Sequence, residues 1–175
     1  MSEAGKGLVM VYTGDGKGKT TAALGLAFRA AGHGYKILAV HFMKGRNYGE
    51  AKAAVYLPHF DVMKAGREKF VNRDNPDPED LRLAAEGFKR AKEAALSGAY
   101  NLILLDEIIV AINYNLVSMQ DVLDLIDERA PGVDLVLTGR NAPPEIMERA
   151  DMVSEVKAIK HHYASGIKAR EGIEF

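Results

Sequence analysis

The feature that most constrains this chain is a glycine-rich stretch, Thr13–Thr21, which reads TGDGKGKTT. It follows the apolar run Leu8–Tyr12, which predicts a buried strand, and it leads into the Ala- and Leu-rich run Thr20–Ala31, which predicts a helix. Glycine permits backbone conformations that turn successive N–H groups inward, and the start of a helix adds partial positive charge. The sequence therefore predicts a phosphate-binding loop; a glycine-rich turn without a chemical role is the alternative.

Two side chains of this loop suit a bound nucleotide. Lys19 can neutralise phosphate oxygens, and the Thr20 hydroxyl can hold Mg²⁺. The usual pattern has four residues between its first glycine and Gly-Lys-Thr. Here three residues separate Gly14 from that triplet, and Thr13 stands where the first glycine would be. We therefore do not expect this loop to hold phosphates as an ordinary kinase or GTPase does.

The rest of the chain alternates apolar strands with helices. Strands are predicted at Lys36–Met43, Tyr100–Leu105 and Val133–Thr138, and helices from Asp77-Pro78 to near Gly98 and from Ser118 to about Arg129. This order is typical of the α/β class, with a mostly parallel sheet, helices on both faces and right-handed crossovers. The stretches Arg46–Ala54 and Gly66–Pro78 lack a clear pattern, so we expect long loops there, where function is often located.

Composition excludes several classes of protein. A chain of 175 residues predicts one domain, and 23 basic against 24 acidic side chains leave no basic excess to hold nucleic acid. The chain has no cysteine, so neither a disulfide framework nor a thiolate metal site is expected. We see no secretory signal and no apolar run long enough to cross a membrane, and we expect a cytoplasmic protein without a membrane partner.

Two further candidate sites follow predicted strands. Asp106 and Glu107 come directly after the strand Tyr100–Leu105, at the edge of a parallel sheet where the phosphate-binding loop also lies, so they can hold Mg²⁺ opposite Thr20. The alternative is that Asp106 only caps the next helix. Arg140 follows another strand and can make bidentate contacts to a phosphate through two of its guanidinium nitrogens, or it can be a solvated loop residue.

The histidines and most aromatic residues need no ligand to explain them. His161 and His162 are adjacent and have no ligand partner near them in sequence, so a metal site there is not favoured. We expect structural roles for His33 and His41. The aromatic side chains expected in the core or in strands are Tyr12, Phe28, Phe42 and Phe60.

Together these residues resemble the P-loop type of ATP:corrinoid adenosyltransferase, the enzymes that make adenosylcobalamin. The segments that carry the resemblance are Val11–Ala23, Arg29–Gly34, Phe42–Gly45, Leu104–Glu107, Thr138–Arg140, Ala150–Glu155 and Val156–Phe175. They span nearly the whole chain, and the shortened loop in combination with the other segments is specific. The loop alone would not be.

The resemblance implies a fold, a reaction and its participants. The fold is a single P-loop NTPase-like (RecA-like) domain over residues 1–175. In this family the cobalt(I) of a corrinoid attacks the 5′ carbon of ATP, and the whole triphosphate leaves, during biosynthesis or salvage of adenosylcobalamin. ATP and the corrinoid are the substrates, Mg²⁺ is the metal, a flavoprotein is the reductant, and the protein acts as a homodimer.

The resemblance also implies the residues of the site. Lys19 and Glu107 are the expected catalytic residues, and Thr20 and Glu107 hold Mg²⁺ with Asp106 in support. The residues expected to bind ATP are Gly14, Asp15, Gly16, Lys17, Gly18, Lys19, Thr20, Thr21 and Arg140. No general base is expected, because cobalt(I) is itself the nucleophile.

The chain departs from the family at two places. Members carry a segment ahead of the first strand that folds over the nucleotide, whereas only Met1–Lys6 precede that strand here, so a lid would come from elsewhere in the chain or be absent. A Gly-Phe-Thr-Trp stretch lies beneath the corrinoid in the family, and this chain has Gly66–Phe70 instead. We expect Phe70 to contact the lower face of the corrinoid, with Val71 as second choice; the alternative is that Phe70 anchors the loop to the core.

Two other functions fit the phosphate-binding loop. A small-molecule or nucleoside kinase would transfer the terminal phosphoryl group and leave ADP, whereas an adenosyltransferase leaves triphosphate. A regulatory protein that hydrolyses ATP slowly would show no dependence on a corrinoid.

Overall fold

The computed structural model describes residues 5–45 and 48–175. Its strands are β1 Val9–Thr13, β2 Ile37–Phe42, β3 Phe60–Ala65, β4 Leu102–Asp106, β5 Asp134–Thr138 and β6 Met152–Glu155. Its helices are α1 Lys19–Gly32, α2 Gly49–Ala54, α3 Pro78–Ser97, α4 Ile108–Asn113, α5 Met119–Glu128 and α6 Pro144–Arg149, with a short 3₁₀ helix, η1, at His162–Ser165. The described strands form one six-stranded sheet in the order β3-β2-β4-β5-β1-β6, and all paired strands are parallel.

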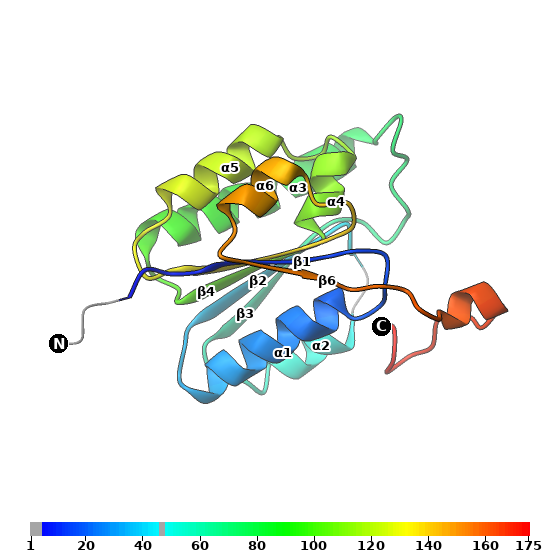
Figure 1. Ribbon diagram of the computed structural model, residues 1–175, viewed down its shortest axis with the longest axis horizontal. Coiled ribbons are helices and arrows are strands. Elements are labelled where there is room, and N and C mark those ends of the chain that lie inside the picture. The colour runs from blue at the N-terminus through cyan, green and yellow to red at the C-terminus, as the bar shows by residue number, and fades with distance from the viewer. Residues whose placement is uncertain (1–4, 46–47) are drawn as a thin grey trace.

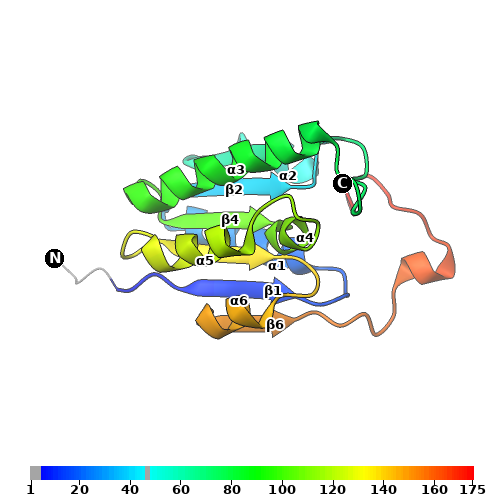
Figure 2. The same cartoon turned by 90° about the horizontal axis from the view of Figure 1, so that it is seen from above.

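The sheet lies between two layers of helices. Figure 1 shows α1 and α2 on one face of the sheet and α3, α4, α5 and α6 on the other, and Figure 2 shows the second layer from above. The central strands β2 and β4 are buried along their whole length. Strand β5 separates β1, which leads into the glycine-rich loop, from β4, which ends at Asp106. This is the RecA-like P-loop arrangement, and the predicted fold class is confirmed.

Every strand and helix named above as predicted is present, with ends that shift by a few residues. The long helix α3 begins as expected, because the Asp77 carboxylate accepts a hydrogen bond from the Glu79 amide, and it ends at Gly98 in the left-handed conformation. The capping interaction predicted for α5 is also present, since the Ser118 side chain accepts from the Asp121 amide.

The elements that the sequence did not reveal are short or lie at the edges of the sheet. Strands β3 and β6 are the two edge strands and bury their side chains only in part. Helices α2, α4 and α6 have six residues each, too few to show a helical period. The expectation of a loop at Arg46–Ala54 is wrong for 49–54, which form α2, while Arg46 and Asn47 lie outside the described residues. Residues 66–77 form a loop as predicted.

Among the expected core aromatics, Phe28 is the exception. Phe42 is fully buried in the larger core cluster, and Tyr12 and Phe60 are half-buried against the smaller cluster that includes Ala23 and Ala27 of α1. Phe28 is 63% exposed, so its predicted core position is wrong. Helix α1 packs on the sheet through Ala23 and Ala27, which lie on one face, and Phe28 points about 100° away from Ala27 around the helix axis.

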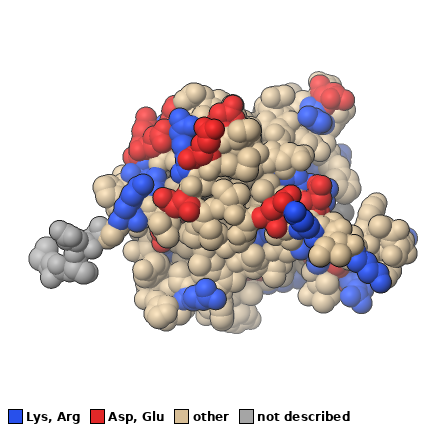
Figure 3. All heavy atoms as spheres, viewed as in Figure 1, with Lys and Arg blue, Asp and Glu red and all other residues tan. Residues whose placement is uncertain are grey.

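The surface carries charges of both signs. On the face in Figure 3, Lys and Arg lie beside Asp and Glu over the helical layer rather than in a separate patch. One such contact joins two helices, since the Arg149 side chain of α6 pairs with Asp127 of α5 at 3.2 Å. Within residues 5–45 and 48–175, no helix has the length and apolar character that crossing a membrane requires.

Candidate active site

The glycine-rich loop between β1 and α1, predicted to bind phosphate, is packed tightly against the chain that follows β6. The Gly16 amide donates to the Val156 carbonyl at 2.7 Å, and a Cβ atom on Gly16 would lie 2.7 Å from that same oxygen. Gly18, the N-cap of α1, has φ 122°, and no side chain caps this helix. Glycine is therefore required at these positions, and the first amides of α1 stay available for an anion.

Lys19 lies over its own loop. It is nearly buried, at 7% exposure, and its Nζ donates to the carbonyls of Gly14 at 2.7 Å and Gly16 at 2.8 Å. Burial lowers the pKa of this amine, while the negative charge of Glu107 opposes the shift. The ammonium is thus held against the carbonyls of the loop that is predicted to bind an anion.

Asp106 contacts four other residues of the site. Its Oδ1 accepts hydrogen bonds from the Thr20 and Thr138 hydroxyls, both at 2.8 Å. Its Oδ2 lies 2.9 Å from His41 Nδ1 and accepts from Lys44 Nζ at 2.6 Å. Burial opposes ionisation, but the His41 hydrogen bond and the Lys44 charge together hold the pKa of this carboxyl well below its usual range.

The alternative in which Asp106 only caps a helix is wrong. Asp106 is the last residue of β4, and the N-cap of α4 is Glu107, which has φ 60° and makes no side-chain cap. The Glu107 amide donates to the Thr138 hydroxyl at 2.9 Å. This unusual backbone conformation carries the Glu107 side chain into the cleft described below.

Glu107 differs from Asp106 in its electrostatics. Burial and the neighbouring Asp106 charge raise the pKa of Glu107, while Lys44 and Lys19 oppose the shift. No hydrogen bond to its carboxylate is found among the residues that the structure describes. Glu107 is therefore the carboxylate best placed to bind an added cation.

The side chains of the site can hold Mg²⁺ only when a bound nucleotide supplies further ligands. No group of three or more His, Cys, Asp or Glu able to hold a metal is found in the described part of the chain. Mg²⁺ is typically held through one or two carboxylates together with substrate phosphates. The Thr20 hydroxyl donates its proton to Asp106 and keeps oxygen lone pairs, and the Glu107 carboxylate has no described partner, so this donor set suits Mg²⁺.

These residues border a cleft of about 790 Å³. Four of its lining side chains are cations, Lys17, Lys19, Lys44 and Arg140. The predicted residues that line it are Gly16, Lys17, Gly18, Lys19, Thr20, Thr21, Glu107 and Arg140. Gly14 and Asp15 lie outside this lining, and Asp106 is buried behind it.

Sequence reasoning missed two parts of the site. His41 lies near the end of β2, directly beside β4, and Lys44 follows that strand two residues after its end. Both could have been found as polar residues at a strand end, as Asp106 was. Residues 161–175 form another wall of the cleft, and no local pattern predicts that. His161 and His162 belong to this wall; their rings stack at 4.8 Å between centroids, and His162 pairs with Glu174.

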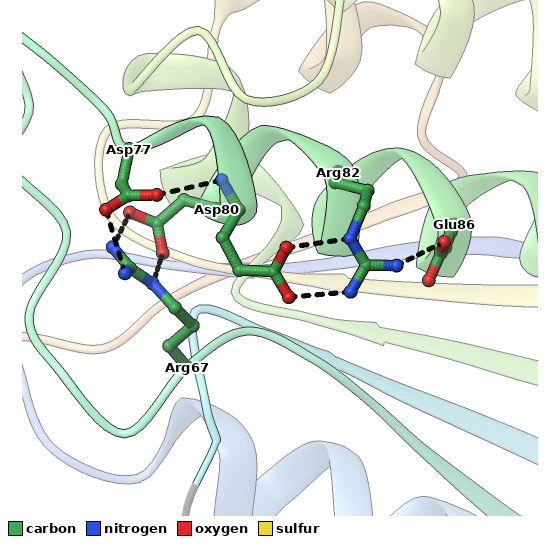
Figure 4. Close-up of polar contacts among 6 residues, drawn as sticks. Arg67, Asp77, Asp80, Arg82 and Glu86 are labelled. Carbon is green, nitrogen blue, oxygen red and sulfur yellow. Dashed lines mark hydrogen bonds and ion pairs between the residues drawn. The ribbon is translucent and has the colours of Figure 1, made fainter.

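Ion pairs hold the two ends of the loop 66–77 together and fix it to α3, as Figure 4 shows. Arg67, at its start, binds the buried Asp80 of α3 with two nitrogens, each at 2.7 Å from an oxygen, and also pairs with Asp77 at 3.0 Å. Phe70 is fully exposed, whereas Val71 is partly buried against the core. The alternative in which Phe70 anchors the loop to the core is therefore wrong, and Val71 makes that contact.

Comparison with known proteins decides among the three functions. The model of the family described as ATP:corrinoid adenosyltransferase BtuR/CobO/CobP matches residues 5–175. This chain belongs to that family. Three relatives named corrinoid adenosyltransferases come from Sinorhizobium sp, Escherichia coli strain K12 and Salmonella typhimurium strain LT2. They are 36%, 35% and 31% identical to it over 173 residues, which cover 97% of this chain and 81%, 86% and 86% of theirs.

As a member of the ATP:corrinoid adenosyltransferases, the chain is a transferase whose substrates are ATP and a corrinoid. The kinase alternative finds no support in these relatives. The predicted resemblance is confirmed over nearly the full length of the chain.

Proposed function

We propose that the cleft beside the phosphate-binding loop is where this corrinoid adenosyltransferase binds ATP and passes its 5′-deoxyadenosyl group to cobalt(I). The observation that carries the proposal is the lining of one cleft by the uncapped start of α1, four cations and Glu107. A triphosphate suits this lining, because backbone amides and cations bind its oxygens. The triphosphate is also the leaving group.

Catalysis then rests on positioning and charge. Cobalt(I) supplies the electron pair that forms the cobalt–carbon bond, and the C5′–oxygen electron pair leaves with the triphosphate. Negative charge therefore grows on the phosphate next to the ribose, where fixed cations stabilise it. Lys19, Lys44 and Arg140 supply these charges, and Asp106 holds Lys44 in place.

We further propose that Thr20 and Glu107 hold Mg²⁺, while the buried Asp106 orients the Thr20 hydroxyl through their hydrogen bond. When bound, Mg²⁺ neutralises part of the triphosphate charge. Asp106 accepts four hydrogen bonds in the ligand-free site, so its oxygens have less capacity for a metal than those of Glu107.

The corrinoid is proposed to lie near loop 66–77, with Phe70 against its lower face. The full exposure of Phe70 and the ion pair between Arg67 and Asp80 support this assignment. The ion pair fixes the loop, and an exposed apolar side chain on a fixed loop can contact a flat ligand. A flavoprotein reductant and a homodimer remain proposals that rest on the family resemblance. A cytoplasmic location remains a proposal that rests on the cysteine-free sequence.

The proposal is tested by mixing the protein with MgATP and chemically reduced cobalamin and following the spectrum of the adenosyl product. Wild-type protein is expected to form adenosylcobalamin, and Glu107→Gln to require more Mg²⁺ for half-maximal rate. If Asp106→Asn alone raised the Mg²⁺ requirement, the roles of the two carboxylates would be exchanged. Absence of product with the folded wild-type protein would contradict the proposal.

A further inference from the structure

Residues 161–175 lie across the cleft from the phosphate-binding loop. Figures 1 and 2 show the chain leaving β6, running away from the sheet to η1, and then returning toward it. The residues of this segment that line the cleft are His161, His162, Tyr163, Ala164, Ala169, Gly172, Ile173, Glu174 and Phe175. The segment and the loop thus form two walls of one site.

Lys17 connects these two walls. Its Nζ donates to the Ile173 carbonyl at 3.1 Å and lies 3.2 Å from Glu174 Oε1. The same carboxylate accepts from the Arg170 amide at 2.6 Å and lies 3.3 Å from His162 Nε2. The Lys17 ammonium therefore binds Glu174, the residue whose carboxylate also holds the two ends of the 161–175 segment together.

Among the described residues, few other contacts join this segment to the rest of the chain. Residues 163–173 are all exposed, and their apolar side chains are not part of the core: Tyr163 is 77% exposed and Ile173 57%. The Glu174 side chain, by contrast, is only 16% exposed. Because apolar burial contributes little here, the contacts around Glu174 decide how the segment is held.

We propose that Lys17 is a positioning residue that latches residues 161–175 to the phosphate-binding loop, so that this segment forms the nucleoside side of the ATP site. The inference rests on the proposed function of the cleft. The Lys17 ammonium is engaged by Glu174 and Ile173, whereas Lys19 points to the inside of the loop. The glycine-rich loop would then have two functions. Its backbone would bind the triphosphate, and its Lys17 side chain would hold residues 161–175 in place.

The chemistry of the two walls matches the two halves of ATP. The loop side presents cations and amides, which suit the triphosphate. The segment presents Tyr163, Ile173 and Phe175, whose uncharged faces suit a flat purine and its sugar. An opened segment would therefore weaken contacts to adenosine and leave those to phosphate intact.

The experiment compares two ligands, MgATP and inorganic triphosphate with Mg²⁺, by calorimetry on the full chain. Lys17→Met and Glu174→Gln are expected to weaken ATP binding by about tenfold, because fewer molecules hold the segment closed. Both variants are expected to change triphosphate binding by less than about twofold on the same reasoning. Hydrogen exchange in 161–175 should rise in the ligand-free variants.

Glu171→Gln is the matched control. Glu171 belongs to the same segment but pairs at 3.9 Å with Lys52, and both side chains are largely exposed, so its loss should change neither affinity nor exchange. Equal weakening of ATP and triphosphate by Lys17→Met would make Lys17 a phosphate ligand and overturn the latch. So would unchanged ATP affinity and exchange in both variants. If wild-type protein bound no ATP, the proposed function would fail, while hydrogen exchange would still test the latch.

Discussion

Replacing each of the two adjacent carboxylates by its amide is expected to change the stability of the ligand-free protein by very different amounts. Asp106 is fully buried and binds Lys44 and His41 through one oxygen and two hydroxyls through the other. Glu107 is only partly buried, and no described hydrogen bond reaches its carboxylate. The Asp106→Asn and Glu107→Gln variants keep shape and remove one charge each, so they are matched.

The size of the difference follows from these contacts. Removing one partner of a buried ion pair typically costs about 3–5 kcal/mol. Asp106→Asn keeps the volume, and the Thr20 and Thr138 hydroxyls can turn to accept from the new amide, so we expect the lower end, about 3 kcal/mol. For a chain of this size that lowers Tm by roughly 6–12 °C. In Glu107 burial disfavours the charged form and raises its pKa, so Glu107→Gln should be neutral within about 0.5 kcal/mol or stabilising.

The assay is urea unfolding at neutral pH without nucleotide or Mg²⁺, followed by circular dichroism. Two-state curves give the free energy of unfolding of each variant. Similar losses in both variants would refute the division of roles, and so would a larger loss in Glu107→Gln.

Three further variants test other parts of the site. Lys19→Ala should abolish adenosyl transfer while far-UV circular dichroism stays unchanged, since the side chain contacts mainly its own loop; near-normal turnover would refute its role. Phe70→Ala should be severely slowed when a flavoprotein must reduce cob(II)alamin, but much less with chemically prepared cob(I)alamin; an equal loss in both assays would argue against lower-face contact. Arg67→Ala should expose the 66–77 loop to limited proteolysis, whereas Arg82→Ala, which removes only the exposed pairs with Glu79 and Glu86, should not.

The sequence alone was sufficient for the features that depend on local pattern. The strand, glycine-rich loop and helix around Lys19 were predicted because apolar periodicity and glycine spacing are local signals. Asp106 and Thr138 were recognised as strand ends, and parallel strands bring such ends together.

What the sequence did not predict depends on contacts between distant residues. That His41 and Lys44 share one oxygen of Asp106 follows from the pairing of β2 with β4, which no local pattern gives. The 161–175 segment has no periodicity, and its place is set by contacts with Lys17, more than 150 residues earlier in the chain. Edge strands such as β3 were missed because half-exposed strands lack a continuous apolar run.

The most direct test of adenosyl transfer in this cleft is to count the phosphorus products of a single reaction. Wild-type protein, MgATP and chemically reduced cobalamin are mixed, and adenosylcobalamin is measured by its spectrum while triphosphate and ADP are separated by anion exchange. We predict one triphosphate for each adenosylcobalamin and no ADP above the protein-free control. Formation of ADP in place of triphosphate, or triphosphate release that does not depend on the corrinoid, would contradict this function.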